Sequence, residues 1–210
     1  GNIAWGFLCL KFELSMKKIL ILALTMLTSL NVTAKESKEI STAVFAGGCF
    51  WCVESDFESV KGVLKVETGY AGGDKETVTY KEVSSGLTNH TEVVKIYYDK
   101  SVISYQQLVY KFFRTIDPTV KNRQFCDVGP QYRTAIFYNN EEEKVIALKE
   151  RVKVEKELKV KIYTQIEKEK NFNLAEEYHQ NYYLKNPIRY KYYRHSCGRD
   201  RTVNKIWSKV

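Results

Sequence analysis

Two cysteines three residues apart, Cys49 and Cys52, carry the most reactive side chains in this sequence. They follow Gly47 and Gly48 at the point where a short apolar strand is expected to pass into a helix. At a helix N-terminus, the unpaired backbone N–H groups and the helix dipole favour the thiolate, which is the nucleophilic form of cysteine. Residues three apart in a helix share a face, so the two thiols are close enough to form a disulfide. We therefore predict a reactive thiol at Cys49 with a possible redox partner at Cys52.

A Cys-x-x-Cys pair is also found in zinc sites and in permanent disulfides. Cys126 and Cys197 stand far apart in the sequence, so no second close pair completes a usual four-ligand zinc site, and no metal is expected. The spacing alone does not distinguish a permanent disulfide from a redox couple.

Other side chains favour a catalytic role for the thiol. Glu92 opens the apolar face of an alternating strand, where burial raises the pKa of a carboxyl group and keeps a proton available near neutral pH. Asp127 and Tyr132 fall in or beside a long polar loop, and Phe50 and Trp51 follow the thiol as a potential aromatic wall. Together these groups suit a small substrate that combines an apolar group with a polar oxygen.

The elements that must position these residues are indicated by hydrophobic periodicity. The order of strands and helices lacks regular alternation, which is typical of an α+β fold with two layers rather than a doubly wound sheet. Ser104 is a plausible N-cap for the most amphipathic helix. We expect strands near residues 42–46, 63–70, 92–98, 132–138 and 160–166, and helices near residues 49–60, 105–116, 141–158 and 175–184.

The N-terminal part of the sequence has the features of a targeting segment. Lys17 and Lys18 follow Met16, a 12-residue apolar run comes next, and small residues precede Lys35. We expect residues 1–15 to be an upstream, non-native segment, residues 16–34 a signal peptide, and residues 35–41 a short linker. Residues 42–210 then form a single catalytic domain, whose tail from about residue 188 to residue 210 carries Cys197. The expected product is exported, to the periplasm or the medium, without stable membrane association after cleavage.

The charge of the chain gives no sign of a nucleic-acid partner. The net charge is +8, but lysines are interleaved with glutamates along residues 149–170, which is typical of a solvated helix face. A basic stripe with interleaved aromatic residues and a recognisable binding motif are both missing from the sequence, so we expect no nucleic-acid binding.

Several motifs resemble one known family, the peptide methionine sulfoxide reductases of the A class. The likeness runs in order from residue 42 to about residue 190, and the family's fold implies a mixed sheet with packed helices in a ferredoxin-like roll. The motifs that carry it are Gly48-Cys49-Phe50-Trp51, Gly69-Tyr70-Ala71-Gly72-Gly73, Tyr80-Lys81-Glu82-Val83, His90-Thr91-Glu92-Val93-Val94, Asp117-Pro118-Thr119, Asn122-Arg123-Gln124, Gln131-Tyr132-Arg133 and Ala175-Glu176-Glu177-Tyr178-His179-Gln180.

The resemblance implies a reaction and a role for each site residue. The Cys49 thiolate attacks the sulfur of methionine S-sulfoxide, peptide-bound or free, while Glu92 protonates the oxygen, which yields methionine and a sulfenic acid on Cys49. The family needs no metal or bound cofactor. The remaining site residues implied by the resemblance are Phe50 and Trp51 around the substrate methyl group, Tyr80 and Tyr132 as hydrogen-bond donors to the oxygen, and Asp127, which helps to organise the pocket.

The resolving thiol, which condenses with the sulfenic acid to a disulfide, has three candidates, because many family members have glycine where this chain has Cys52. We rank Cys52 first for its helical spacing, Cys197 second because a mobile tail could reach the site, and Cys126 third. A thioredoxin-like dithiol is expected to reduce the disulfide by exchange, and the enzyme is expected to be a monomer. General disulfide exchange by Cys49 and Cys52 is the alternative activity, and a non-catalytic secreted binding module is a distant third.

Overall fold

The computed structural model describes residues 38–208 of the chain. The predicted upstream segment (1–15), the signal peptide (16–34) and the first residues of the linker lie outside the described residues. The predicted domain start at residue 42 falls inside the first strand, which begins at Ile40.

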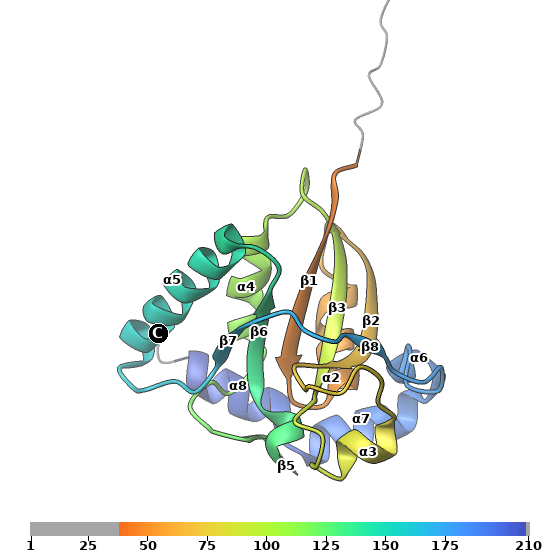
Figure 1. The fold of residues 1–210 in the computed structure, drawn as a ribbon. Coiled ribbons are helices and arrows are strands. Elements are labelled where there is room, and N and C mark those ends of the chain that lie inside the picture. Colours follow the sequence, from red (N-terminus) through yellow and green to blue (C-terminus); the bar gives the residue numbers. More distant parts are fainter. Residues whose placement is uncertain (1–37, 209–210) are drawn as a thin grey trace, which may run out of the picture. The chain divides into compact units, whose positions relative to one another are not determined.

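One mixed sheet of six strands forms the centre of the fold (Figure 1). Its order is β7-β6-β1-β3-β2-β8, in which β6 and β7 are parallel and the other neighbours are antiparallel. The predicted α+β class and the mixed sheet are thereby confirmed. The strands are β1 (Ile40–Gly47), β2 (Val63–Ala71), β3 (Thr91–Asp99), β6 (Thr134–Tyr138), β7 (Gln165–Lys168) and β8 (Asn173–Leu174).

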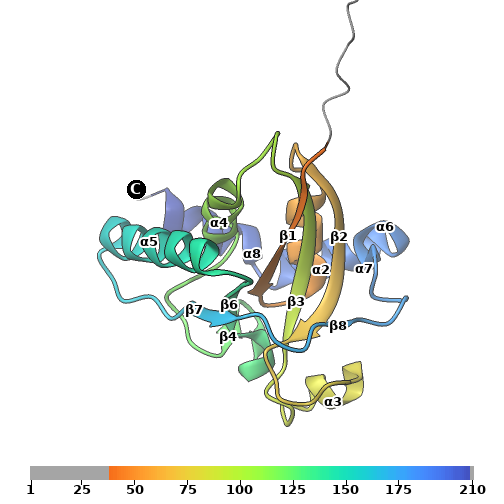
Figure 2. The ribbon, with the colours of Figure 1, turned by 45° about the horizontal axis from the view of Figure 1, so that its top comes forward.

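Three helices pack against one face of the sheet: α2 (Phe50–Glu58), α4 (Tyr105–Phe113) and α5 (Glu141–Leu158) (Figure 2). As predicted, Ser104 caps α4, where its side chain accepts a hydrogen bond from the Gln107 backbone N–H and the Gln107 side chain accepts one from the Ser104 N–H. Within residues 38–208, no helix is long and apolar enough to cross a membrane.

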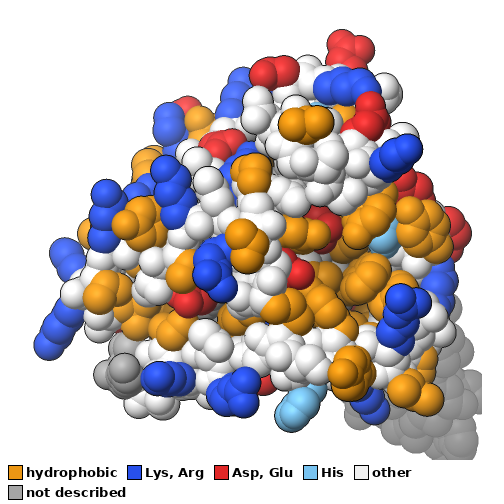
Figure 3. All heavy atoms as spheres, turned by 90° about the horizontal axis from the view of Figure 1, so that it is seen from below, with side chains coloured by type: hydrophobic (Ala, Val, Ile, Leu, Met, Phe, Trp, Pro, Cys, Tyr) orange, Lys and Arg blue, Asp and Glu red, His pale blue; other side chains and the backbone are white. Residues whose placement is uncertain are grey.

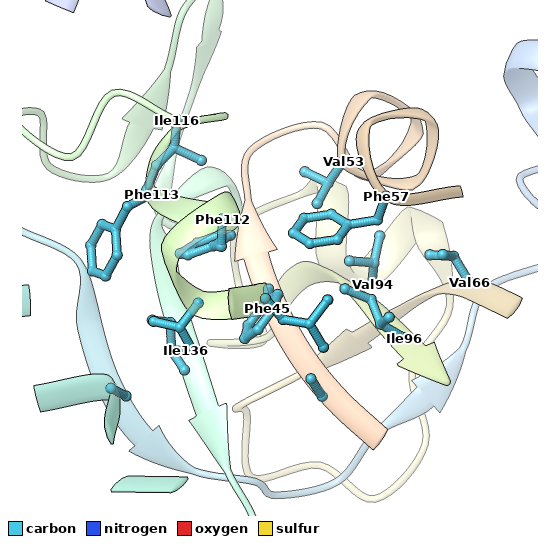
Figure 4. Close-up of a cluster of buried hydrophobic side chains, with 14 of the residues drawn as sticks. Phe45, Val53, Phe57, Val66, Val94, Ile96, Phe112, Phe113, Ile116 and Ile136 are labelled. Carbon is cyan, nitrogen blue, oxygen red and sulfur yellow. The ribbon is translucent and has the colours of Figure 1, made fainter. Parts of the chain in front are cut away.

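The core follows the period-two alternation of the strands. On β1, Ala43 and Phe45 belong to the large cluster beneath the helices, whereas Val44 and Ala46 belong to a small cluster on the opposite face. Phe172, from the connection between β7 and β8, packs against that small cluster. Figure 4 shows side chains of the large cluster; those labelled are Phe45, Val53, Phe57, Val66, Val94, Ile96, Phe112, Phe113, Ile116 and Ile136. The buried core therefore holds the last residues of β1 and the first residues of β3 in place. The candidate site is built from these two ends.

Short elements at one end of the sheet complete the fold. A hairpin of two-residue strands lies within the long polar loop that the sequence indicated, and a 3₁₀ turn follows it. These elements are α3 (Tyr80–Ser84), β4 (Arg123–Gln124), β5 (Asp127–Val128) and the 3₁₀ turn Pro130–Tyr132.

The C-terminal region differs most from the sequence-based expectation. The predicted helix over residues 175–184 is wrong: only α6 (Tyr182–Lys185) is helical there. The Gln180 side chain instead accepts a hydrogen bond from the Thr68 N–H and donates one to the Thr68 C=O, which ties this segment to β2. The predicted strand over residues 160–166 is also displaced, since β7 begins only at Gln165.

The segment expected to be a mobile tail is a pair of helices. It forms α7 (Pro187–Ser196) and α8 (Arg199–Trp207), and Gly198 joins them with a φ of +68°. Gly198 is suited to this left-handed conformation because glycine has no Cβ. The tail therefore forms two successive helices, and it brings side chains to the candidate site.

Candidate active site

A small cavity of about 90 Å³ lies at the N-terminal end of α2. Its face of the molecule is viewed in Figure 3, where hydrophobic side chains gather across the middle. All seven residues that the sequence analysis assigned to the nucleophile, the acid and the substrate pocket line this cavity, and Tyr193 is an eighth. The lining residues are Cys49, Phe50, Trp51, Tyr80, Glu92, Asp127, Tyr132 and Tyr193.

Gly48 makes the turn that places Cys49 at the start of α2. Its φ is +80°, a conformation that residues with a Cβ rarely adopt. A Cβ added at Gly48 would lie 2.5 Å from Cβ of Gln124, which is fully buried. Gln124 is held there because its side-chain amide accepts from the Asp117 N–H and donates to the Asp117 C=O. The turn is therefore fixed by both backbone conformation and packing.

Replacing Gly48 by alanine is expected to lower the free energy of unfolding by about 2 to 4 kcal/mol, because positive φ and overpacking each cost about 1 to 3 kcal/mol. Gly86→Ala is the matched control, since Gly86 has a φ of +76° but its nearest neighbour would be 3.4 Å from an added Cβ. Urea unfolding of both variants measures the difference. An equal loss of stability in the two variants would show that contact with Gln124 does not matter.

Cys49 is the N-cap residue of α2, and Cys52 follows one turn later. Both are free thiols, both are buried, and the Cys52 N–H donates to the Cys49 C=O over 3.1 Å. Burial raises the pKa of Cys49, and the neighbouring Cys52 thiol adds to this effect. The pKa of Cys52 is lowered, first by its hydrogen bond with Cys49 and then by the charges of Arg199 and Arg194. Within the resting pair, the proton is therefore held more strongly by Cys49 than by Cys52, whereas the helix N-terminus alone had indicated a thiolate at Cys49.

Glu92 lies on β3 and faces the N-terminus of α2. Its Oε2 accepts a hydrogen bond from the Phe50 backbone N–H at 3.0 Å. Burial, together with the nearby Asp127 carboxyl group, raises the pKa of Glu92 to about 8, although the Phe50 hydrogen bond opposes this shift. The carboxyl group is therefore protonated at neutral pH and can serve as a proton donor in the cavity, as predicted from its place on the strand.

Three phenols supply further donors. Burial raises the pKa of Tyr80 to about 12 and raises those of Tyr132 and Tyr193 as well, so all three hydroxyls keep their protons at neutral pH. Tyr193 Oη donates to Asp127 Oδ2 at 2.5 Å. Tyr80 and Tyr132 have no such hydrogen bond among the described residues, so their hydroxyls are available to a polar atom in the cavity.

Glu176 holds the segment that carries Tyr80. One carboxylate oxygen accepts from the Tyr80 backbone N–H at 2.8 Å, and the other accepts from Tyr70 Oη at 2.7 Å. A single side chain thus links α3 to β2. The carboxylate therefore fixes the segment around residue 176 against α3 and β2.

Trp51 forms a wall of the cavity and is fixed on two sides. Its indole N–H donates to Nδ1 of His179 at 3.1 Å, and its ring stacks on Tyr182 with centroids 3.7 Å apart. Burial lowers the pKa of His179 to about 4, so the ring is neutral and can accept this hydrogen bond. Phe50 packs on the other side of His179, at a centroid distance of 4.9 Å. The two aromatic residues therefore have fixed orientations before any substrate binds.

Tyr193 is the lining residue that sequence reasoning missed. The sequence predicts that most tyrosines near the C-terminus are packing or rim residues and that some of them border the substrate cleft, but nothing in their spacing marks one of them as different. Tyr193 is distinguished only by the position of α7, which brings its hydroxyl to Asp127 and its ring edge to Trp51. The nearby Tyr193 hydroxyl group also lowers the pKa of the Cys49 thiol, against the effect of burial.

The other two cysteines are joined to each other. Cys126 and Cys197 form a disulfide with a Cα–Cα distance of 4.9 Å, which links the β4–β5 hairpin to the end of α7. The sequence analysis treated both as possible resolving thiols and did not foresee this pairing. In this structure Cys52 is the free thiol beside Cys49, whereas Cys197 does not line the cavity.

No cluster of three or more His, Cys, Asp or Glu side chains among residues 38–208 could hold a metal ion. The reactive and polar groups that line the cavity are one thiol, two carboxyl groups and three phenols.

Comparison with known proteins gives a consistent result. A sequence profile described as "Peptide methionine sulfoxide reductase" matches residues 41–210. The "Peptide methionine sulfoxide reductase MsrA 2" of Rhizobium meliloti (strain 1021) is 50% identical over 165 residues, which cover 79% of this chain and 82% of that protein. Mxr1 from Saccharomyces cerevisiae in its reduced form has a similar structure, with a TM-score of 0.69 and 34% identity over 75% of this chain and 91% of that one. Mxr1 has also been solved in complex with Trx2, a structure that is 23% identical to this chain with a TM-score of 0.50, over 73% of this chain and 91% of that one.

Proposed function

This chain belongs to the peptide methionine sulfoxide reductase family, and on that premise we propose that it reduces methionine S-sulfoxide, in proteins, in peptides or free, to methionine. One observation carries the proposal: a single cavity is lined by a thiol, a carboxyl group that is protonated at neutral pH, and phenol donors. A sulfoxide needs these groups, since its sulfur is attacked by a nucleophile while its oxygen must accept protons.

In the first step, the Cys49 sulfur attacks the sulfoxide sulfur, and the Glu92 carboxyl group protonates the sulfoxide oxygen. The sulfur–oxygen bond of the substrate breaks, the oxygen is transferred to Cys49 as a sulfenic acid, and the proton that leaves the Cys49 thiol restores the protonated Glu92 carboxyl group. The substrate gains two electrons, and Cys49 loses them. Tyr80 and Tyr132 can donate hydrogen bonds to the oxygen as negative charge develops on it. Phe50 and Trp51 accept the methyl group on the apolar side of the cavity.

In the second step, the Cys52 sulfur attacks the Cys49 sulfur, a disulfide forms, and the oxygen leaves as water. Cys52 is suited to this role because it is a free thiol one helical turn from Cys49. Cys126 and Cys197 are already paired with each other, so we place both behind Cys52 as candidates. The net reaction converts one sulfoxide and two thiols into one sulfide, one disulfide and one water.

A thioredoxin-like dithiol is proposed to restore the Cys49–Cys52 pair by thiol–disulfide exchange, without a bound cofactor. The complex of Mxr1 with Trx2 supports this class of partner. We also propose that the enzyme is exported and acts as a monomer in the repair of oxidised proteins. Export rests on the features of residues 16–34, and an intact mass of exported protein that does not begin at Lys35 would contradict the proposed cleavage.

The activity is tested by incubating the protein with a methionine sulfoxide peptide and dithiothreitol and following methionine formation by chromatography. We expect turnover with the S epimer and little with the R epimer. A protein that reduces disulfides but forms no methionine would support general disulfide exchange instead.

Replacing Cys52 by serine is expected to leave methionine formation in the first turnover but to slow the loss of the second thiol at least tenfold, because Cys49 then waits as a sulfenic acid for a more distant partner. Free-thiol titration after one turnover without reductant measures the rate at which the second thiol is lost. The Cys126→Ser/Cys197→Ser double variant is the control and is expected to lose two thiols at the wild-type rate. The assignment of Cys52 is wrong if the Cys52→Ser variant behaves like this control.

A further inference from the structure

We propose that Thr91 and Gln131 are positioning residues that hold the three donors of the cavity in place around the sulfoxide oxygen. The donors are Glu92, Tyr80 and Tyr132. The inference rests on the proposed function and deepens it, because it assigns a role in the reduction step to two buried side chains that do not line the cavity.

The three donors come from three separate elements. Glu92 is the second residue of β3, Tyr80 is the first residue of α3, and Tyr132 is the last residue of the 3₁₀ turn. Two of these elements are short, since α3 has five residues and the turn has three. Donors stabilise a developing negative charge when they lie about 2.7 to 3.1 Å from it, and a misplacement of about 1 Å can slow a reaction about 10²-fold. Contacts outside the cavity must therefore fix the elements relative to one another.

Thr91 ties β3 to the 3₁₀ turn. Its side chain is fully buried, and its Oγ1 donates a hydrogen bond to the Gln131 carbonyl oxygen at 2.7 Å. Successive strand residues point to opposite faces, so Thr91 makes this bond from the face opposite Glu92. The carbonyl group belongs to the peptide unit that leads into Tyr132, and the N–H of the same unit donates to the Gly129 carbonyl oxygen at 3.0 Å. Both polar groups of this peptide unit are therefore held, and the separation of Glu92 from Tyr132 is fixed.

The Gln131 side chain ties the same turn to α3. Its Nε2 donates to the Ser84 carbonyl oxygen at 3.2 Å, at the end of the helix that Tyr80 begins. The carboxamide is confined, because a Cβ added at Gly129 would lie 2.3 Å from its Oε1 and a Cβ added at Gly86 would lie 3.4 Å from it. Its Oε1 is buried without a hydrogen-bond partner among the described residues, which costs stability. An apolar side chain of the same size would avoid that cost but would lose the link to α3.

Arg133 provides a second link between the turn and the segment before β3. Its Nη1 donates to the carbonyl oxygens of Asn89 and Pro130, both at 3.2 Å. Because this link remains when the Thr91 hydroxyl is removed, the turn is expected to shift and not to detach. Removal of the hydroxyl should therefore misplace the donors while the fold is kept.

The grip on the substrate methyl group does not depend on these contacts. Trp51 is fixed by His179 and Tyr182, and Phe50 packs against His179. Misplaced donors weaken the stabilisation of charge on the oxygen, which develops only in the transition state. The maximal rate of reduction should therefore fall while substrate binding changes little.

The test compares Thr91→Val, which has nearly the same shape but lacks the hydroxyl, with Thr115→Val. Thr115 is the matched control, since it is also buried and its Oγ1 donates to the Phe112 carbonyl oxygen at 2.8 Å, outside the cavity. Single-turnover methionine formation without reductant, at rising concentrations of a methionine sulfoxide peptide, gives the maximal rate and the half-saturating concentration. We expect the maximal rate to fall about tenfold in Thr91→Val, with a half-saturating concentration within about twofold of the wild type. Thr91→Ser, which keeps the hydroxyl, should recover most of the rate, and Thr115→Val should match the wild type.

A double-mutant cycle separates positioning from a general loss of stability. If Thr91 acts through Tyr132, Thr91→Val should slow the Tyr132→Phe protein by less than about threefold, because the donor to be positioned is already missing. Gln131→Met in a Tyr80→Phe background gives the same comparison for the second link, and it serves if Thr91→Val does not fold. A maximal rate in Thr91→Val equal to that of Thr115→Val, or an undiminished loss in the Tyr132→Phe background, would overturn the inference. If the wild type itself forms no methionine, the proposed function fails instead.

Discussion

Replacing Cys49 by serine is expected to lower the rate of methionine formation by at least about 10³-fold, because removal of a nucleophile leaves only binding and electrostatic effects. Serine keeps the N-cap position of α2, and it can still hydrogen-bond to its neighbours. Chromatographic measurement of methionine with dithiothreitol in excess gives the rate. Circular dichroism is expected to show an unchanged fold.

The control for this variant is Cys126→Ser, which also removes one cysteine but lies outside the cavity. It is expected to retain wild-type methionine formation with dithiothreitol. A Cys49→Ser protein that still forms methionine at more than a tenth of the wild-type rate would place the nucleophile elsewhere.

Replacing Glu92 by glutamine is expected to lower the rate by about 10² to 10⁴-fold, the range for loss of a general acid. The amide oxygen can still accept the hydrogen bond from the Phe50 N–H, so the geometry is preserved while the acidic proton is lost. Because the pKa of Glu92 is raised to about 8, the wild-type rate should fall as pH rises through 8. The variant should lack this alkaline limb.

Glu54→Gln is the matched control, since Glu54 is also buried and its pKa is raised to about 7, but it does not line the cavity. Its rate is expected to remain near that of the wild type.

The pH dependence of stability gives a second test of the raised pKa of Glu92. A carboxyl group with a raised pKa binds its proton more tightly in the folded state, so the wild type loses stability relative to Glu92→Gln as pH rises from 4.5 to 8. A wild-type alkaline limb that persists unchanged in Glu92→Gln would exclude Glu92 as the acid.

Local signals predicted the elements that carry the site. The alternation from Glu92 to Tyr98 matches β3, where Val94, Ile96 and Tyr98 enter the large core and Glu92 ends on the cavity. The two glycines before Cys49 mark the turn into α2 because Gly48 has positive φ. These features depend on neighbours within a few residues, so they can be recognised without knowledge of the fold.

The features that the sequence could not predict depend on contacts between residues that are far apart in the chain. Glu176 and Gln180 form side-chain hydrogen bonds with α3 and β2, and these contacts hold residues 175–180 against the sheet, where periodicity had indicated a helix. Tyr193 reaches the cavity only because α7 lies beside the start of α2. The Cys126–Cys197 disulfide joins residues separated by 71 positions, and no spacing rule identifies such a pair.

A single turnover without reductant, followed by tryptic mass spectrometry, tests most directly whether one sulfoxide is reduced while Cys49 and Cys52 are oxidised to a disulfide. Cleavage after Lys38 and Lys61 releases one peptide that contains both cysteines, and Cys126 and Cys197 fall in other peptides. We predict one methionine formed per protein and the loss of two hydrogens from the peptide 39–61, with the Cys126–Cys197 disulfide unchanged. Methionine formation with an unaltered peptide 39–61, or with a disulfide from Cys49 to another peptide, would contradict the account.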